Sequence, residues 1–383
     1  MKKILFVVMS GDLARGGGSA IAALHLIEGF KMYKDLEIRA VVCNEGSLTE
    51  RLKNLGVKYY CTSIARMSLY PQVRNPFVMA KRVIGILMRN WKVTKEICNI
   101  IDDFHPDLVH SNNLAIHVGY FAAKMKHVKH VWHIREYVDL DHGFHVMPSL
   151  GILDKWLHNS YTLSITHDVA RHHGCIRESD FVVYDGVMHE DNIKWVNKKQ
   201  DYFLFVGRIN PEKGVTTLIS AYILYSKNNN LCELWLAGSG DEIYINKIKT
   251  DLIKEGLENR VKFLGFRDDR YDLMAHARAT IVPSRFEAFG FITVEAMMNG
   301  SLVIGNNTAG TRMIMKEADG CEIPYDSMEE LAQCMTMVSN NPMELYTERI
   351  LKAQQIANSR FTIEQCVQNT YKVYRQIINN GIK

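Results

Sequence analysis

Residues 2–30, KKILFVVMSGDLARGGGSAIAALHLIEGF, contain the pattern that decides the fold. Residues 2–10 form a short, continuous apolar run, which is typical of a strand buried on both faces. A loop with three successive glycines at 16–18 follows, and it leads into an apolar helical pattern. A doubly wound α/β domain begins in this order, with a strand, a glycine-containing turn and a helix.

The same alternation runs along the rest of the chain. Further strands are predicted at 38–43, 107–112, 130–134, 162–166 and 181–187, with helical patterns between most of them. A polar stretch at 189–201 interrupts the series, which then resumes with strands at 202–209, 232–241, 261–266, 279–284 and 301–307. We therefore predict an α/β fold of two doubly wound Rossmann-like domains that face a central cleft. The predicted bounds are 1–195 for the N-terminal domain, 200–361 for the C-terminal domain, and 362–383 for a C-terminal helix packing back towards the first.

Composition narrows the class of protein. A chain of 383 residues suits two domains, and 47% hydrophobic with 23% charged residues is the balance of a globular protein. No apolar run reaches the roughly 18 residues of a membrane span, and the N-terminus turns polar too early for a signal peptide. The eight cysteines have no CxxC spacing, which favours free thiols in a reducing compartment. We therefore expect a cytoplasmic protein.

The segment SRFEAFGFITVEAMMNG (284–300) places two acids, Glu287 and Glu295, in an apolar context. On one helix, eight steps would leave their side chains roughly 80° apart, a poor spacing for a buried pair. The spacing fits better if a helix begins between them, with Gly290 at the turn, so that both acids can reach a ligand at the helix N-terminus. A capped, solvated helix start is an equally weighted alternative.

Four motifs in order resemble one known family. VGRINPEKG (206–214), LAGSGD (236–241), VKFLGF (261–266) and PSRFEAFGFITVEAMMNG (283–300) look like the retaining glycosyltransferases of family four, which have the two-domain GT-B fold. The resemblance implies that Arg208 and Lys213 bind the diphosphate of a nucleotide sugar. It also implies that Glu287 binds the donor sugar and that Glu295 binds the ribose hydroxyls.

The resemblance and the chemistry together give a list of site residues. Arginine offers a bidentate donor to phosphate and lysine a point charge, while glycine lets a ligand approach the backbone closely. His133 in HVWHIRE (130–136) matches the family's active-site histidine, with Arg135 and Glu136 as weaker candidates. The expected catalytic residues are His133, Glu287, Arg208 and Lys213, and the expected donor-binding residues are Gly17, Gly18, Gly238, Phe266, Ala288, Phe289, Gly290, Phe291 and Glu295.

No metal and no cofactor is expected. The family resemblance implies that the leaving phosphate oxygen takes the proton of the acceptor, with retention of configuration and catalysis by positioning and electrostatics. The sequence DLD (139–141) mimics the Asp-x-Asp of metal-dependent transferases, but its place in a loop after His133 favours a surface or acceptor-side role. The donor is a nucleotide diphosphate sugar, with UDP-sugar favoured over GDP-sugar.

The sequence also departs from the family's pattern. TAGTRMI (308–314) has Ala309 where the family has its first glycine and Met313 where it has an acid. Asp185 and Gly186 stand where the family commonly has Asn and Gly. The first departure changes the nucleotide and sugar end of the site.

A basic, apolar segment at residues 66–95 is a candidate membrane surface. It carries seven Lys or Arg between 66 and 95 with aromatic and aliphatic residues among them, as in helices that lie on anionic bilayers. A helix with its apolar face in the core is the equally weighted alternative. No nucleic-acid motif accompanies these charges.

The resulting hypothesis is a retaining, metal-independent hexosyltransferase-type enzyme of cell-surface polysaccharide synthesis. It would transfer a sugar to a glycan or lipid-linked glycan acceptor in the cytoplasm, at the inner face of the cell membrane. The alternatives are a catalytically silent GT-B subunit or glycan-binding partner, and a sugar-nucleotide epimerase or phosphorylase on the same fold.

Overall fold

The computed structural model describes residues 1–64, 68–69, 76–142, 145–146, 150–196, 198–227, 232–318 and 323–379. The chain forms two compact units. Unit 1 comprises residues 1–186 and 363–383, and unit 2 comprises residues 187–362. The polar stretch 189–201 therefore belongs to the start of unit 2.

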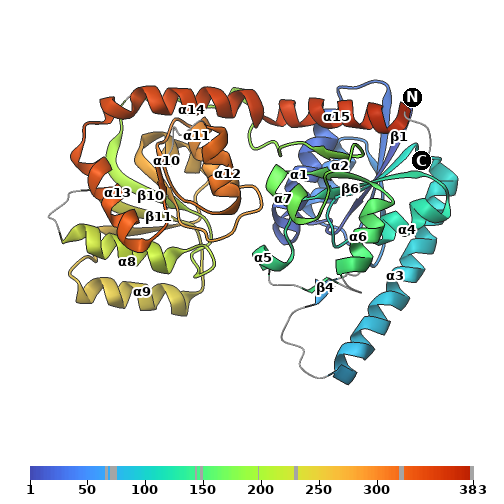
Figure 1. The fold of residues 1–383 in the computed structure, drawn as a ribbon, viewed down its shortest axis with the longest axis horizontal. Helices are drawn as coiled ribbons and strands as arrows, with labels where there is room; N and C mark the ends of the chain where they lie inside the picture. Colours follow the sequence, from blue (N-terminus) through green and yellow to red (C-terminus); the bar gives the residue numbers. More distant parts are fainter. Residues whose placement is uncertain are drawn as a thin grey trace. The chain divides into compact units, whose positions relative to one another are not determined.

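Unit 1 is built on a parallel sheet of seven strands in the order β3-β2-β1-β5-β6-β8-β9 (Figure 1). The strands are β1 (Lys2–Val8), β2 (Leu36–Val42), β3 (Lys58–Cys61), β5 (Leu108–Ser111), β6 (Lys129–Ile134), β8 (Tyr161–Ser164) and β9 (Asp180–Val182). The helices are α1 (Leu13–Phe30), α2 (Ser47–Asn54), α3 (Pro76–Phe104), α4 (Val118–Met125), α5 (Asp139–His142), α6 (Leu150–His158), α7 (His167–His172) and α15 (Ile363–Asn379). Two short strands, β4 (Ser68–Leu69) and β7 (His145–Val146), pair with each other.

Unit 2 repeats the arrangement with six parallel strands in the order β12-β11-β10-β13-β14-β15. These are β10 (Gln200–Val206), β11 (Glu233–Ala237), β12 (Val261–Gly265), β13 (Ala277–Val282), β14 (Val303–Asn306) and β15 (Ile323–Tyr325). The helices are α8 (Val215–Ser226), α9 (Glu242–Lys254), α10 (Arg270–His276), α11 (Phe291–Met298), α12 (Ala309–Glu317), α13 (Met328–Asn340) and α14 (Thr347–Arg360), with 3₁₀ turns at Glu190–Asn192 and Met343–Tyr346.

Both sheets have the strand order of a doubly wound fold, in which the first strand is central and the chain turns back at its far side. The predicted fold class of two Rossmann-like domains is therefore confirmed. The strands β3 and β15, which the sequence analysis did not predict, lie at sheet edges. Edge strands need no continuous apolar run: β3 is only partly buried, and β15 has three residues, one of them Pro324.

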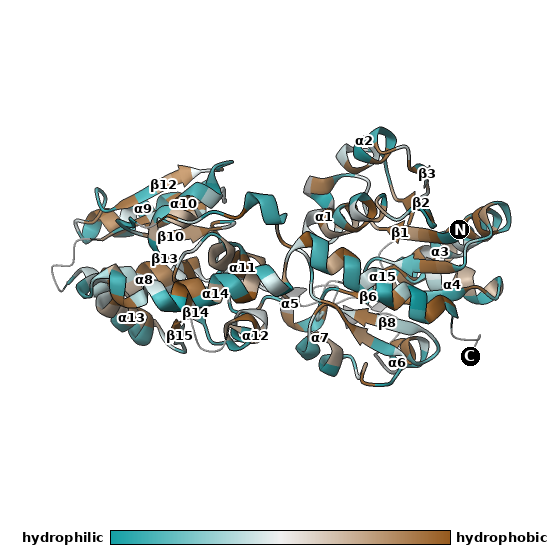
Figure 2. Ribbon diagram, turned by 90° about the horizontal axis from the view of Figure 1, so that it is seen from above, coloured by the Kyte–Doolittle hydropathy of each residue, from teal (hydrophilic) through white to brown (hydrophobic). Residues whose placement is uncertain are grey.

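Apolar strands make the core of each unit, and many of them stand out in brown in Figure 2. In unit 1 the helix α15 packs against α1, although almost the whole chain separates them (Figure 1). The contact is close because Gly29 of α1 has no side chain: a Cβ there would lie 2.3 Å from a methyl carbon of Val367.

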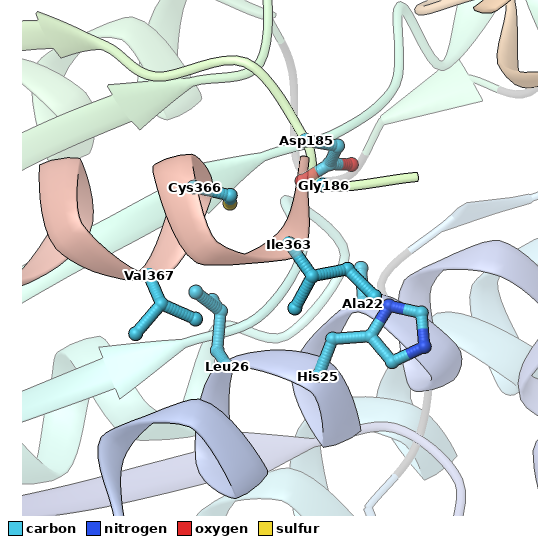
Figure 3. A pocket seen from close by; sticks show the side chains of 8 residues that line it. All are labelled: Ala22, His25, Leu26, Asp185, Gly186, Ile363, Cys366 and Val367. Carbon is cyan, nitrogen blue, oxygen red and sulfur yellow. The ribbon is translucent and has the colours of Figure 1, made fainter. Parts of the chain in front are cut away.

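The start of α15 lies next to the end of unit 1's main segment. Figure 3 shows Ile363, Cys366 and Val367 of α15 grouped with Leu26 of α1 and with Gly186. A Cβ on Gly186 would lie 2.5 Å from the Cα of Ile363, so this junction requires glycine. The last helix thus completes the core of unit 1.

Candidate functional site

The loop before α11 brings together two of the predicted residues in unit 2. Gly290 is the N-cap of α11 and has φ 98°, a conformation that glycine adopts at little cost. Glu287 lies in the loop before it, and its Oε1 accepts a hydrogen bond from Nζ of Lys213 at 2.5 Å. The helix therefore begins between Glu287 and Glu295, as the spacing predicts.

Glu295 lies inside α11 and is only 7% exposed. Its Oε1 accepts from Nη2 of Arg270 at 3.3 Å and from the Tyr271 hydroxyl at 3.5 Å. Its Oε2 is buried and has no hydrogen-bond partner in the part of the chain that the structure describes. Burial raises the pKa of the Glu295 carboxyl, although Arg270 opposes this effect. Arg270 and Tyr271 are not among the site residues predicted from the sequence, and it is the fold that brings them to Glu295.

The carboxyl ends of three neighbouring strands supply three more of the predicted residues of unit 2. After β10, the N–H of Gly207 donates to the carbonyl of Ala237, and Arg208 follows with an exposed side chain. After β11, Gly238 lies so close to Gly207 that a Cβ would be 1.8 Å from its carbonyl oxygen. Phe266 follows β12 and is exposed. Ligands bind at this edge of doubly wound sheets.

The aromatic residues at the start of α11 have different surroundings. The Phe289 side chain is buried and its ring lies 5.8 Å from that of Phe361, so it belongs to the core of unit 2. Ala288 and Phe291 are partly exposed. Only the backbone of Phe289 therefore remains a candidate for ligand contact.

The segment in which the sequence departs from the family lies against this loop. The N–H of Gly310 donates to the carbonyl of Glu287 at 2.8 Å, so α12 supports the Glu287 loop. Ala309 has φ 44°, in the left-handed region that favours glycine. Met313, where the family has an acid, is buried. The alanine at the glycine position therefore carries backbone strain.

In unit 1, the three glycines lie inside α1 and interrupt it. Gly17 has φ 57° and ψ −151°, which breaks the helix, and nothing lies within 4 Å of where its Cβ would be. Gly18 is exposed. The break in α1 therefore leaves open space beside the backbone of Gly17, at the carboxyl end of β1.

His133 lies near the end of β6 and is fully buried. Its Nδ1 lies 3.1 Å from Nη2 of Arg135 and 3.3 Å from Nε2 of His110. Because arginine can only donate, Nδ1 is the acceptor, and the ring hydrogen is on Nε2. Burial, with Arg135 and His110 adding to it, holds the pKa of His133 well below its usual range. His133 is therefore neutral, and its Nε2 has no partner among the residues described.

The surroundings of His133 were not predicted from sequence. His110 Nδ1 lies 2.5 Å from the Tyr374 hydroxyl of α15, and the two buried rings meet edge to face. Nη1 of Arg135 donates to Oδ1 of Asp185, and both side chains are buried. Asp185, one of the departures from the family, thus neutralises Arg135. Glu136 accepts the backbone N–H of Leu114 at 2.9 Å.

Asp139 is the acid of the DLD segment whose side chain the structure describes. Asp139 Oδ1 pairs with Nε2 of His172 at 2.8 Å. No group of three or more His, Cys, Asp or Glu that could hold a metal occurs in the described ranges.

Residues 189–356, nearly all of unit 2, match the family described as glycosyl transferases group 1. Unit 2 is therefore similar to the domains of that family. This domain contains the Lys213 and Glu287 pair and Glu295.

Curated relatives of the chain are also described as glycosyltransferases. Two uncharacterized glycosyltransferases of Methanocaldococcus jannaschii are each 25% identical to it. The first alignment covers 55% of this chain and 60% of that protein, and the second covers 79% and 84%. The chain therefore matches less than two thirds of the first relative's length.

The fold has solved counterparts. The structure of Anabaena Alr3699/HepE in complex with UDP superposes with a TM-score of 0.78 at 20% identity, covering 98% of this chain and all of that one. A structure of S. aureus TarM with UDP, fondaparinux and α-GlcNAc-glycerol has a TM-score of 0.72 at 13% identity, covering 99% and 100% of the two chains. These comparisons confirm the predicted GT-B fold class. The membership in retaining family four stays a prediction.

Proposed function

We propose that the protein transfers a hexose-type sugar from a nucleotide diphosphate sugar, with UDP-sugar favoured over GDP-sugar, to a glycan or lipid-linked glycan. The observation that carries this proposal is the convergence of Lys213 and Glu287 at the start of α11, with Glu295 inside it. Named relatives with a glycosyltransferase description and a solved counterpart with UDP support it.

The diphosphate would lie at the start of α11. Lys213 supplies positive charge there through its contact with Glu287, and Arg208, which follows β10, would add a second charge. The first N–H groups of the helix have no carbonyl partners within the helix. Lys213 pairs with Glu287, and both side chains are partly exposed. Separating this pair therefore costs little free energy. A diphosphate would attract Lys213 and leave Glu287 to accept hydroxyl hydrogens of the donor sugar.

Glu295 would bind the ribose of the donor. Its Oε2 has no partner among the described residues, and its charge is disfavoured by burial. Two ribose hydroxyls are donors that would satisfy such a carboxylate. Phe266 would lie beside the base.

Transfer would proceed with retention and without a metal. The bond between the anomeric carbon and the diphosphate oxygen breaks as the acceptor oxygen attacks from the same face. The leaving phosphate oxygen takes the acceptor's proton, so positive side chains and helix amides stabilise the developing charge. In unit 1, the neutral His133 would donate its Nε2 hydrogen to the donor sugar.

A thermal-shift panel tests this proposal. The panel contains UDP, GDP, ADP and their common sugar conjugates, with and without EDTA, on the wild type and on Lys213→Gln, with Lys254→Gln as control because Lys254 is an exposed lysine of the same unit. A shift by one nucleotide series that persists in EDTA and falls in Lys213→Gln alone supports the donor site. A shift that EDTA abolishes and Mn²⁺ restores contradicts metal independence, and no shift with any nucleotide contradicts the transferase.

We also propose that α3 places unit 1 on an anionic membrane, at the inner face of the cell membrane. In Figure 1 the first half of α3 extends beyond the rest of unit 1, and its side chains Ile84, Met88 and Trp91 are exposed. These positions are four and three residues apart, so they share one face of the helix. The second half of α3 is buried at Ile97 and Ile101. The interpretation as a core helix therefore holds for the second half alone.

Positive charge accompanies the exposed face. Lys81, Arg82 and Arg89 are exposed on the first half of α3 and Lys92 and Lys95 just after it, and such charges attract anionic headgroups. Residues 66, 70 and 74 of the predicted surface lie outside the described residues. None of the helices in the described ranges is long and apolar enough to span a bilayer.

A further inference from the structure

A small hollow in unit 1 lies at the carboxyl end of β1, beside the break in α1. Its polar side chains are Ser10, Arg15, Ser19 and Asn113, from the ends of β1 and β5 and from α1. It is open to solvent, and about 30 Å³ of it admits the centre of a water-sized group. This is room for one or two hydroxyl-sized groups, and too little for a nucleotide.

The position of the hollow is the one at which a doubly wound sheet binds ligands. β1 pairs with β2 on one side and β5 on the other, so the strand order reverses here. The break at Gly17 holds the backbone of α1 away from its helical path and leaves open space. The loop after β5 is fixed because Nδ2 of Asn112 donates to the carbonyl of Ser19 at 2.8 Å.

The buried side-chain oxygen of Asn113 indicates that a ligand binds in the hollow. It is 9% exposed, it lines the hollow, and its Oδ1 has no hydrogen-bond partner among the described residues. A buried acceptor without a donor is costly, and native structures normally satisfy it. A hydroxyl group that enters the hollow would donate to this oxygen.

Arg15 adds a positive charge to the same hollow. Its side chain is exposed, and the described ranges offer it no ion-pair partner. The carboxylate of Asp12, in the same loop, instead accepts the backbone N–H of Arg15 at 2.9 Å. A guanidinium and an amide oxygen in one small hollow match a ligand that has an oxyanion next to a hydroxyl.

We infer that this hollow binds the acceptor, and that the acceptor is a sugar or polyol with an acidic group beside a hydroxyl. The inference rests on the proposed glycosyl transfer, because it names the molecule that receives the sugar. The acidic group would be a phosphate or a carboxylate, since both present oxyanions to Arg15. Asn113 would accept the hydroxyl hydrogen.

Isothermal titration of the full chain tests this inference. The probes are glucose 6-phosphate and glucuronate. Glucose is the uncharged control, and inorganic phosphate is the control that lacks the sugar ring and its hydroxyls. The variants are Arg15→Gln and Asn113→Leu, with Arg171→Gln as control, because Arg171 is an exposed arginine elsewhere in unit 1. Both acidic sugars, or one of them, should bind at least tenfold more tightly than glucose and phosphate. Binding of one alone identifies the acidic group.

The variants separate the two contacts. Arg15→Gln should lower the affinity for the acidic sugars about tenfold or more and leave glucose unchanged, whereas Asn113→Leu should weaken every sugar and leave phosphate unchanged. Asn113→Leu should keep or raise the melting temperature, because it removes a buried acceptor without a partner. Equal binding of all four probes, or equal binding by both variants and wild type, overturns the inference.

Titrations repeated with saturating UDP distinguish this inference from the proposed function. Acidic sugars that bind equally well with UDP present support an acceptor site. Sugars displaced by UDP overturn it, since the hollow would then belong to the donor diphosphate. UDP that does not bind contradicts the proposed transfer itself, whereas UDP that binds while no acidic sugar does contradicts the acceptor inference alone.

Discussion

Replacing Glu295 by glutamine separates a ligand-binding role from a structural one. Glu295 is buried, its hydrogen bonds to Arg270 and Tyr271 are long at 3.3 and 3.5 Å, and its Oε2 is without a partner in the described ranges. Because burial raises the pKa of Glu295 more than Arg270 lowers it, the fold disfavours the charged carboxylate. Glu295→Gln should therefore be at least as stable as the wild type at pH 7 without ligand.

The sign of the pH dependence follows from the raised pKa. A carboxyl with a higher pKa in the folded than in the unfolded state favours folding at low pH, and this contribution is lost as the pH rises through the folded pKa. The stability of the wild type relative to Glu295→Gln should thus fall as the pH rises from about 4.5, the ordinary value for glutamate, towards neutrality.

Donor binding should respond in the opposite direction. A hydrogen bond to a charged group contributes about 1.5–3 kcal/mol, so loss of the carboxylate charge should weaken UDP binding roughly 10- to 100-fold. At 100 times its dissociation constant, UDP stabilises the wild type by about 2.7 kcal/mol. A variant that binds 100-fold more weakly would gain only about 0.4 kcal/mol at the same concentration.

Differential scanning fluorimetry with and without UDP measures both effects, at about 2–4 °C per kcal/mol for a domain of this size. Glu258→Gln, a change at an exposed glutamate of unit 2, is the control. If Glu295→Gln lowers the melting temperature by several degrees without ligand, Glu295 is a structural partner of Arg270. If the variant keeps the full UDP shift, Glu295 does not bind the donor. Either result refutes the reasoning.

Three further predictions concern other parts of the chain. Asp185→Ala should destabilise by about 3–5 kcal/mol in urea unfolding because it leaves the buried Arg135 unpaired, and Arg135→Met combined with Asp185→Leu should recover most of the loss. Ala309→Gly should raise the free energy of unfolding by up to about 1 kcal/mol, because it relieves a left-handed alanine; a lower value would show that Ala309 is not strained. Arg82→Glu with Arg89→Glu should abolish sedimentation with anionic liposomes while leaving the melting temperature unchanged, and undiminished sedimentation would contradict membrane binding by α3.

The order of the elements could be predicted because each doubly wound half repeats a local pattern of apolar strand, turn and helix. The start of α11 was also predictable, since the spacing of Glu287 and Glu295 fits better with a helix that begins between them. The edge strands β3 and β15 were not, because β3 is only partly buried and β15 has only three residues, one of them Pro324.

The partners of the site residues could not be predicted, because they are distant in sequence. Arg270 lies 25 residues from Glu295, and Tyr374 lies 264 residues from His110. Only the folded sheet and the return of α15 to unit 1 bring Tyr374 to His110. A motif therefore identifies a histidine at position 133, whereas its neutral state depends on contacts made through the fold.

Two charged pairs, one in each unit, differ in a way that bears on their roles. Arg135 and Asp185 are 4% and 2% exposed, so separating them would leave two charges buried without compensation. Lys213 and Glu287 are 29% and 21% exposed, and a pair of that kind contributes only about 0–1 kcal/mol. A ligand with two phosphates can therefore displace Glu287 from Lys213, whereas no ordinary ligand can displace Asp185 from Arg135. The pair in unit 2 is suited to exchange partners during a reaction cycle, and the pair in unit 1 is suited to hold the end of β6 and His133 in one geometry throughout.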